Sequence, residues 1–242
     1  HLPGAWTPAA DSFFPYPAHE QEVRRWTALM ANLGYPDEGE ELEFPVTEAE
    51  ARMARQLAGD HPYVCLHPGA SEESRRWPAQ KFAQVGDLLA ERGFGVFITG
   101  SPAERELAAA TAGMMNSAAT NLAGQTELGV LAALLKGASL LVSNDTGVSH
   151  LAAAVRAPSV VIFLASDPLR WAPLNEELHR AVGSVHPRHR NACVHTPELT
   201  GHRCLMDGCR SLRVSDSKEW RPPEVEEVAS AALELLARRQ AR

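Results

Sequence analysis

Short apolar segments alternate with helical patterns through the middle of this 242-residue sequence. Helical patterns of about 10 to 15 residues follow the apolar segments, so neighbouring strands are predicted to pair in parallel. The segments are rich in residues suited to strands buried on both faces. They are 63–67 (YVCLH), 94–100 (FGVFITG), 139–143 (SLLVS) and 159–164 (SVVIFL), and the helical patterns cover 78–93, 102–115, 126–138 and 148–157. The predicted fold class is therefore α/β, a Rossmann-like parallel sheet with helices on both faces.

Three further helices are predicted outside the alternating region. Residues 19–33 carry apolar side chains at helical spacing. Residues 47–59 open with Thr47 three positions before Glu50, which is the spacing of a capping box. The last helix covers 222–239, with prolines in its first turn and arginines at its end.

Composition excludes several classes of partner. The formal net charge is −7, which gives no support to a general role in binding nucleic acid or membrane surfaces, so any anionic ligand must be held by local groups. No stretch approaches the ~20 apolar residues of a transmembrane segment, and the first residues lack the order of a signal peptide. A cytoplasmic location is expected, and the four cysteines are too few and too unevenly spaced for a secreted disulfide scaffold.

The joint between one predicted strand and the next helix, SNDTGVSH (143–150), carries an unusual set of polar residues. Asp145 or Thr146 can cap the helix, and Gly147 lets a ligand approach the first free amides, where the helix dipole favours an anion such as phosphate. His150 can donate to a phosphate oxygen, and the Asp145 carboxylate suits sugar hydroxyls. The alternative is a plain capped helix with a core histidine.

Two more polar loops follow predicted strands, and parallel strands bring all three loops to one rim of the sheet. After the first strand, the backbone near Ser71 can present amides, and Arg75 and Arg76 can bind phosphate unless they form a solvated face. After the second strand, Glu104 lies in the first turn of a helix. It either complements the helix dipole or binds ribose hydroxyls, as acids do near the second strand of nucleotide-binding folds.

The glycine pattern excludes the commonest nucleotide-binding motifs. The sequence contains neither GxGxxG nor GxxxxGK[ST] at these joints, so dinucleotide-dependent oxidoreductases and P-loop triphosphatases lose their usual support. The letters DTG (145–147) also occur in aspartic proteases, but those enzymes need two such aspartates facing each other in an all-β fold. This sequence has one DTG, and it leads into a helix.

Five blocks in this order resemble glycosyltransferase family 9, the bacterial ADP-heptose:lipopolysaccharide heptosyltransferases and their relatives. They are HPGASEESRRWP (67–78), TGSPAERE (99–106), LAGQTELGVLAALL (122–135), VSNDTGVSHLAAA (142–154) and SDPLRWAP (166–173). The resemblance implies the GT-B fold, two Rossmann-like domains around a cleft. Residues 61–242 then form the C-terminal, nucleotide-sugar-binding domain, and residues 1–60 form the end of the N-terminal acceptor domain and the connector.

The resemblance also implies roles for residues of the donor site. Arg75 stands where the family often has a lysine facing the donor phosphates, and Glu104 matches the acid that holds the ribose. Gln125 and Thr126 fall in the block that borders the base. The block around the diphosphate and the transferred sugar contains Asp145, Thr146, Gly147 and His150.

The implied activity is that of an inverting glycosyltransferase, which moves a sugar from a nucleotide-diphosphate donor to lipopolysaccharide or another glycan. ADP-heptose is the leading candidate donor, with no further cofactor, and the acceptor is a glycan or lipid-linked glycan at the inner face of the bacterial membrane. The general base is expected in an N-terminal domain largely missing from this chain, so the chain alone is expected to be inactive. The alternative is a nucleotide-sugar-binding module without catalysis of its own.

A cluster near the C-terminus has the residue types of a zinc site. Cys193, His195, His202, Cys204 and Cys209 lie within seventeen residues, but their spacing matches no standard zinc motif. Reduced thiols, or a disulfide formed on oxidation, are the preferred interpretation, so no metal site is expected.

Overall fold

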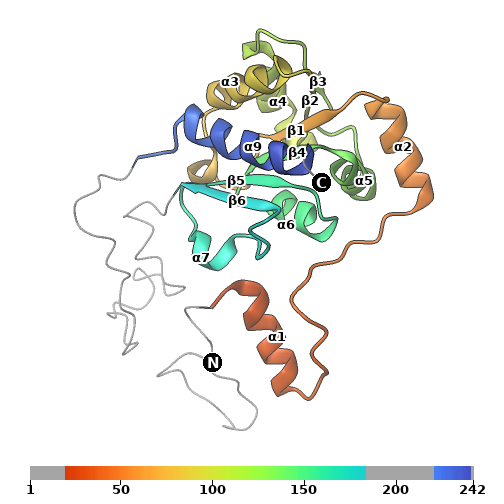
Figure 1. The fold of residues 1–242 in the computed structure, drawn as a ribbon, viewed down its shortest axis with the longest axis vertical. Helices are drawn as coiled ribbons and strands as arrows, with labels where there is room; N and C mark the ends of the chain where they lie inside the picture. The colour runs from red at the N-terminus through yellow and green to blue at the C-terminus, as the bar shows by residue number, and fades with distance from the viewer. Residues whose placement is uncertain (1–19, 184–220, 241–242) are drawn as a thin grey trace.

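The computed structural model describes residues 20–183 and 221–240, and its centre is a six-stranded parallel sheet (Figure 1). The strand order is β3-β2-β1-β4-β5-β6. This order is that of the classic Rossmann fold, so the predicted fold class is confirmed. The strands are β1 (Tyr63–His67), β2 (Gly95–Ile98), β3 (Thr120–Asn121), β4 (Leu140–Asn144), β5 (Ser159–Phe163) and β6 (His179–Gly183).

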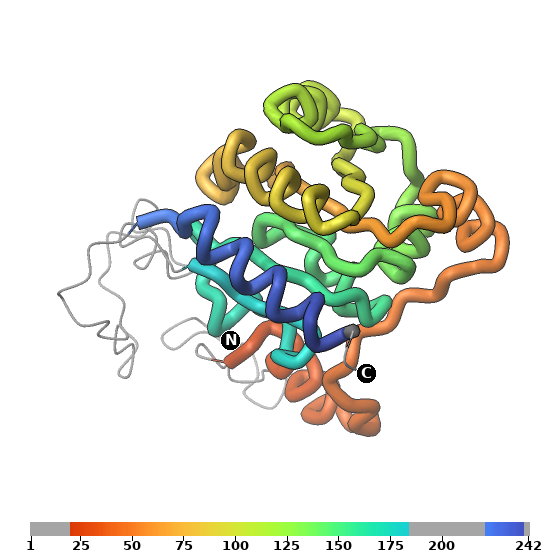
Figure 2. Tube along the Cα trace, turned by 45° about the horizontal axis from the view of Figure 1, so that its top comes forward, coloured from red at the N-terminus to blue at the C-terminus, as the bar shows by residue number. Residues whose placement is uncertain are grey.

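Helices cover both faces of the sheet (Figure 2). One face is covered by α3 (Ala79–Ala90), α4 (Arg105–Met114) and α9 (Val225–Gln240), and the other by α5 (Leu128–Gly137) and α6 (Gly147–Ala154), with α2 (Glu48–Ala58) packed on α5. The remaining helices are α1 (Glu22–Asn32), α7 (Pro168–Trp171) and two 3-10 helices, η2 (Glu73–Arg75) and η3 (Pro102–Glu104).

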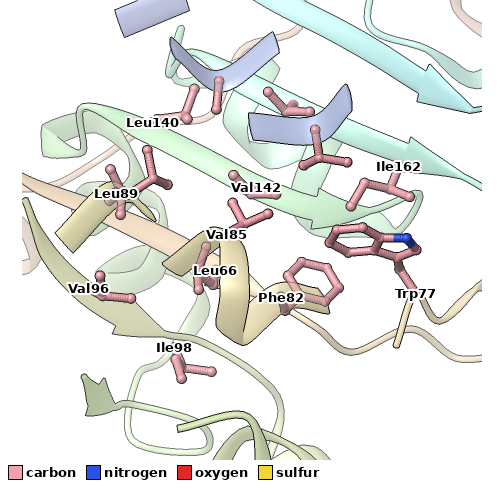
Figure 3. Packing of buried hydrophobic residues seen from close by; sticks show 14 of the residues in the cluster. Leu66, Trp77, Phe82, Val85, Leu89, Val96, Ile98, Leu140, Val142 and Ile162 are labelled. Carbon is pink, nitrogen blue, oxygen red and sulfur yellow. The ribbon is translucent and has the colours of Figure 1, made fainter. Parts of the chain in front are cut away.

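The central strands serve two hydrophobic cores, because successive side chains of a strand point to opposite faces. In β1, Val64 and Leu66 enter the core under α3 and α9, whereas Tyr63 and Cys65 enter the core under α5 and α6. Figure 3 shows Leu66 in the first of these cores, together with residues of the neighbouring strands and of α3. This burial on both faces explains why the strand sequence is continuously apolar.

The C-terminal helix is fastened to the loop after β1. The indole Nε1 of Trp77, which is 1% exposed, donates to the carbonyl of Pro223 at 2.9 Å. Lys81 donates to the same carbonyl at 3.2 Å and to the Glu224 carboxylate at 2.6 Å. These bonds join segments more than 140 positions apart in the sequence, and they complete one face of the sheet.

Candidate functional site

The strand order reverses direction between β1 and β4, and ligands of open α/β sheets bind beyond the carboxyl ends of the strands at such a point. Asn144, which is fully buried at the end of β4, connects the two loops there. Its side-chain amide donates to the carbonyls of Pro68 (2.8 Å) and Gly69 (3.3 Å), and its oxygen accepts from the Trp77 amide (2.9 Å). The loop after β1 is therefore held against the start of the loop after β4.

Asp145 lies next in the chain and is 4% exposed. Its Oδ2 accepts a hydrogen bond from the Ser166 hydroxyl in the loop after β5. Burial raises the pKa of Asp145 above its ordinary value, although the Ser166 hydrogen bond and the nearby side chains of Arg75 and His150 oppose this rise. Arg75 and His150 are therefore close enough to Asp145 to act electrostatically on its carboxylate.

Helix α6 begins at this carboxylate. Of the two residues that could cap this helix, Asp145 and Thr146, it is Thr146 that occupies the N-cap position, in an extended conformation, and its side chain makes no capping hydrogen bond. Its carbonyl instead accepts from both the amide and the hydroxyl of Ser149. A Cβ added to Gly147 would meet no atom within 4 Å, so the first turn of α6 is open to an approaching group. An open helix N-terminus with free amides suits an anion.

Glu104 closes the site on the side of β2, and it has a local structural role. Its carboxylate accepts from the Ser101 amide at 2.7 Å and completes a capping box with that residue. Partial burial would raise the pKa of Glu104, but the hydrogen bonds from Ser101 and the charge of Arg76 outweigh it and lower the pKa. Glu104 also covers the backbone of Gly69, where a Cβ would lie 2.0 Å from its Oε1.

The guanidinium groups of the loop after β1 lie at the edge of this site. Arg75, at the end of η2, forms an ion pair of 3.6 Å with Glu72, and Arg76 donates from Nε to the Ala70 carbonyl at 2.9 Å. Ser71 is exposed at the start of the same loop. The exposed ion pair contributes at most about 1 kcal/mol, so Arg75 can exchange Glu72 for a ligand phosphate at little cost.

The block predicted to border the base lies further along the rim. Gln125 is exposed and donates from its side-chain amide to the Asn121 carbonyl at 2.6 Å, and Thr126 is half-buried beside it. Within residues 20–183 and 221–240, no hydrogen bond or ion pair joins either residue to Asp145. Both residues lie on the rim of the sheet, in the loop after β3.

Three polar residues of this rim were not singled out from the sequence. His67 and Thr99 are buried at the ends of β1 and β2, with 3.0 Å between Nδ1 and Oγ1. The third, Ser166, binds Asp145. A polar residue at the end of an apolar strand is the signal that could have identified His67. The partner of Asp145 could not be found this way, because it comes from another loop.

Two further sequence expectations concern a metal site and a membrane-spanning segment. Within residues 20–183 and 221–240, no group of three His, Cys, Asp or Glu side chains is placed to hold a metal ion. The cysteines and histidines of the zinc alternative lie outside the described residues. Over the same ranges, no helix combines the length and the apolar character needed to cross a membrane.

Comparison with known proteins gives a consistent relationship. A profile of glycosyltransferase family 9 (heptosyltransferase) matches residues 11–202. Lipopolysaccharide heptosyltransferase 3 of Escherichia coli K12 is 35% identical over 164 residues, which are 64% of this chain and 47% of that protein. Lipooligosaccharide heptosyltransferase 2 of Haemophilus influenzae is 30% identical over 142 residues, which are 55% of this chain and 41% of that protein. This chain spans less than half the length of these two relatives.

Solved structures show the same fold. The glycosyl transferase family 9 protein from Veillonella parvula has a TM-score of 0.69 at 20% identity, covering 90% of this chain and 61% of that chain. The ADP-heptose LPS heptosyltransferase II of E. coli has a TM-score of 0.68 at 22% identity, covering 94% of this chain and 65% of that chain. The Rossmann-like sheet is thus that of one half of the GT-B fold.

The region matched by the family profile contains the whole switch point between β1 and β4. It covers more than three quarters of the chain, including all nine residues predicted for the donor site. The order of the strands, the open start of α6 and the five sequence blocks agree with this match. The chain belongs to glycosyltransferase family 9.

Proposed function

We propose that this chain carries the donor site of an inverting glycosyltransferase that moves a sugar from a nucleotide diphosphate to lipopolysaccharide or another glycan. The observation that supports it best is the open N-terminus of α6 at the switch point, with Asp145 and Arg75 beside it. The relatives named above are lipopolysaccharide and lipooligosaccharide heptosyltransferases, and one neighbour's name includes ADP-heptose. ADP-heptose is therefore the donor we propose.

The chemistry follows from where charge develops in the reaction. When the sugar leaves its diphosphate, negative charge builds up on the departing phosphate oxygens. The amides and dipole of α6 and the Arg75 guanidinium stabilise that charge, and the Asp145 carboxylate accepts hydrogen bonds from donor hydroxyls. We assign the general base, which takes the proton of the acceptor hydroxyl, to the acceptor-binding domain of the two-domain fold.

Isothermal titration calorimetry tests the donor site directly. We expect the 242-residue chain to bind ADP, with weaker heats for GDP and UDP, and to transfer no sugar from ADP-heptose to a lipopolysaccharide core acceptor. Absence of binding to all three nucleotides would refute the donor site. Transfer by this chain alone would refute the assignment of the general base to another domain.

Substitution of Gly147 separates a ligand site from an ordinary helix start. Gly147→Ala adds a methyl group that meets no protein atom, so we expect no loss of folding free energy. A phosphate at the first turn of α6 would meet that methyl group, and ADP affinity should fall about tenfold, which corresponds to about 1.4 kcal/mol. Gly113→Ala in α4 is the matched control, because a Cβ there also meets nothing within 4 Å. Equal ADP affinity in both variants would contradict phosphate binding at α6.

A further inference from the structure

A buried histidine, His67, lies beside the Glu104 carboxylate at the rim of the sheet. His67 is the last residue of β1, and its side chain is 9% exposed. Its Nε2 lies 3.9 Å from Oε2 of Glu104. This distance is too long for a hydrogen bond, so the ring acts on the carboxylate electrostatically.

The strands explain why a polar ring is buried here. Side chains alternate along β1, so His67 points to the same face as Cys65, which belongs to the core under α5 and α6. The register pairs Leu66 with Ile98, and Thr99 is therefore the neighbour of His67 across the two strands. Thr99 is 1% exposed. The two residues form a polar layer between the apolar core and the loops of the candidate site.

The hydrogen bonds of this layer determine which ring nitrogen carries the hydrogen. Burial lowers the pKa of His67, so the ring is neutral near pH 7 and has one N–H group. Nδ1 lies 3.0 Å from the Thr99 hydroxyl. The other acceptor for that hydroxyl, the Leu66 carbonyl, is 3.3 Å away and already accepts from the Thr99 amide at 2.8 Å. We therefore assign the hydroxyl hydrogen to Nδ1 and the ring hydrogen to Nε2.

The Glu104 charge favours the same tautomer. A hydrogen on Nε2 places the positive end of an N–H dipole beside the carboxylate, whereas the other tautomer would place a lone pair there. The ring that Thr99 orients from one side thus stabilises the carboxylate on the other.

The Glu104 carboxylate is held by groups from two loops and one strand. Oε2 accepts from the Ser101 amide at 2.7 Å, and Oε1 lies against the Gly69 backbone, where a Cβ would be 2.0 Å away. His67 adds the contact from β1. The Glu104 side chain is still 16% exposed, and a carboxylate has about four acceptor positions, so ligand hydroxyls can also bind it.

Glu104 follows β2, and acids near the second strand of nucleotide-binding sheets bind ribose hydroxyls. Building on the proposed function, we propose that His67 is a positioning residue of the donor site, whose Nε2–H, fixed by Thr99, holds the Glu104 carboxylate in place for the ribose of the donor. Loss of His67 should therefore weaken recognition of the ribose hydroxyls, while the groups proposed to bind phosphate at α6 stay in place.

The tautomer is measured in the ligand-free chain. Long-range proton–nitrogen NMR spectra of the isotope-labelled chain distinguish the two ring nitrogens, and His67→Gln assigns the signals of His67 among those of the ten histidines. We expect a neutral ring with its hydrogen on Nε2. A hydrogen on Nδ1 would turn a lone pair toward Glu104 and would overturn the proposal.

Calorimetry with ADP, 2′-deoxy-ADP and 3′-deoxy-ADP tests the positioning role, because the affinity lost with a deoxynucleotide measures how well that hydroxyl is held. His67→Leu removes both ring nitrogens. His67→Asn also removes the donor to Glu104, but its short amide can still bind Thr99, so it serves if the Leu variant does not fold. His67→Gln is the conservative variant, since its longer side chain carries an N–H close to the position of Nε2.

His179→Leu is the matched control. His179 is also buried (5% exposed) and also has a hydroxyl partner, Ser159 at 2.8 Å, but it lies in the edge strand β6. Thermal unfolding of each variant confirms that the fold is intact.

In the unsubstituted chain, loss of the hydroxyl that Glu104 binds should weaken affinity about tenfold. This factor should fall to about threefold or less in His67→Leu and His67→Asn, and stay about tenfold in His67→Gln and His179→Leu. The same factor in folded His67→Leu or His67→Asn as in the unsubstituted chain, or an equal fall in His179→Leu, would overturn the positioning role alone. If the unsubstituted chain does not bind ADP, the proposed function fails and the positioning role fails with it.

Discussion

Two histidines are buried in the part of the chain that the structure describes, and the environment of each determines its charge. His67 is 7% exposed at the end of β1, and burial lowers its pKa even though the Glu104 carboxylate lies 3.9 Å from Nε2. His179 is 5% exposed at the start of β6, with the Ser159 hydroxyl as its partner. At His67, desolvation lowers the pKa more than the Glu104 charge raises it, and at His179 desolvation alone lowers the pKa. Both rings are therefore neutral near pH 7.

The His179 environment predicts how stability depends on pH. Its pKa is about 4 in the folded chain and ~6.5 in the unfolded chain, so the unfolded chain binds more protons between these values. Folding free energy from this residue is fully present above pH ~6.5 and is lost as the pH falls to about 4, by about 3 kcal/mol. The free energy of unfolding, measured with urea, should decrease less between pH 7 and pH 4.5 for His179→Gln than for the unsubstituted chain. The exposed control His61→Gln should keep the decrease of the unsubstituted chain, and equal decreases in all three would refute the assignment.

At the scale of elements, burial on both faces decides how well the sequence predicts a strand. The prediction for β1 is correct at both ends, because all five residues are buried and the apolar run is continuous. The last strand, β6, was not predicted. It is an edge strand of alternating exposure that contains His179 and Arg180, so it gives no comparable signal.

Some features of the candidate site were predictable from the sequence, and others were not. Its loops were predictable because each directly follows a strand whose end the sequence reveals, as at Asp145. Contacts between distant segments, such as the hydrogen bond between Asp145 and Ser166, were not predictable. A cavity beside α6, whose lining extends from Gln21 to His179, was not predictable either. Such contacts depend on tertiary packing, which leaves no local pattern in the sequence. The donor-binding roles of the nine predicted residues stay predictions.

The link between β1 and β4 predicts a strong effect of a small substitution. Asn144→Asp keeps the side-chain shape but replaces the amide donor with an oxygen that faces the carbonyls of Pro68 and Gly69. The Trp77 amide would remain the donor to one carboxylate oxygen, and the other oxygen would face two carbonyls, so this buried charge should cost about 3 to 5 kcal/mol of folding free energy, measured by urea unfolding at pH 7. Asn121→Asp is the control, because its Oδ1 accepts from the Ala123 amide and an aspartate can do the same. A similar cost for both variants would show that the link contributes little.

At the scale of the whole molecule, the two cores are parts of one structure. The same strands supply alternate side chains to both cores, so neither core can open while the sheet stays intact. The long-range bonds of Trp77 and Lys81 add α9 to this unit. The described sheet and its helices should therefore unfold together, and a ligand bound at the switch point should stabilise every part of them.

Cys65 reports on this unit, because it is fully buried in the middle of β1 and burial raises its pKa to about 12. A thiol reagent should reach it only through global unfolding, where the pKa returns to ~8.5. In a variant with Cys193, Cys204 and Cys209 changed to serine, ADP at 100 times its dissociation constant should slow Cys65 labelling about 100-fold. Labelling at the same rate with and without ADP, in a chain that calorimetry shows to bind it, would mean that β1 opens locally and that the sheet is not one cooperative unit.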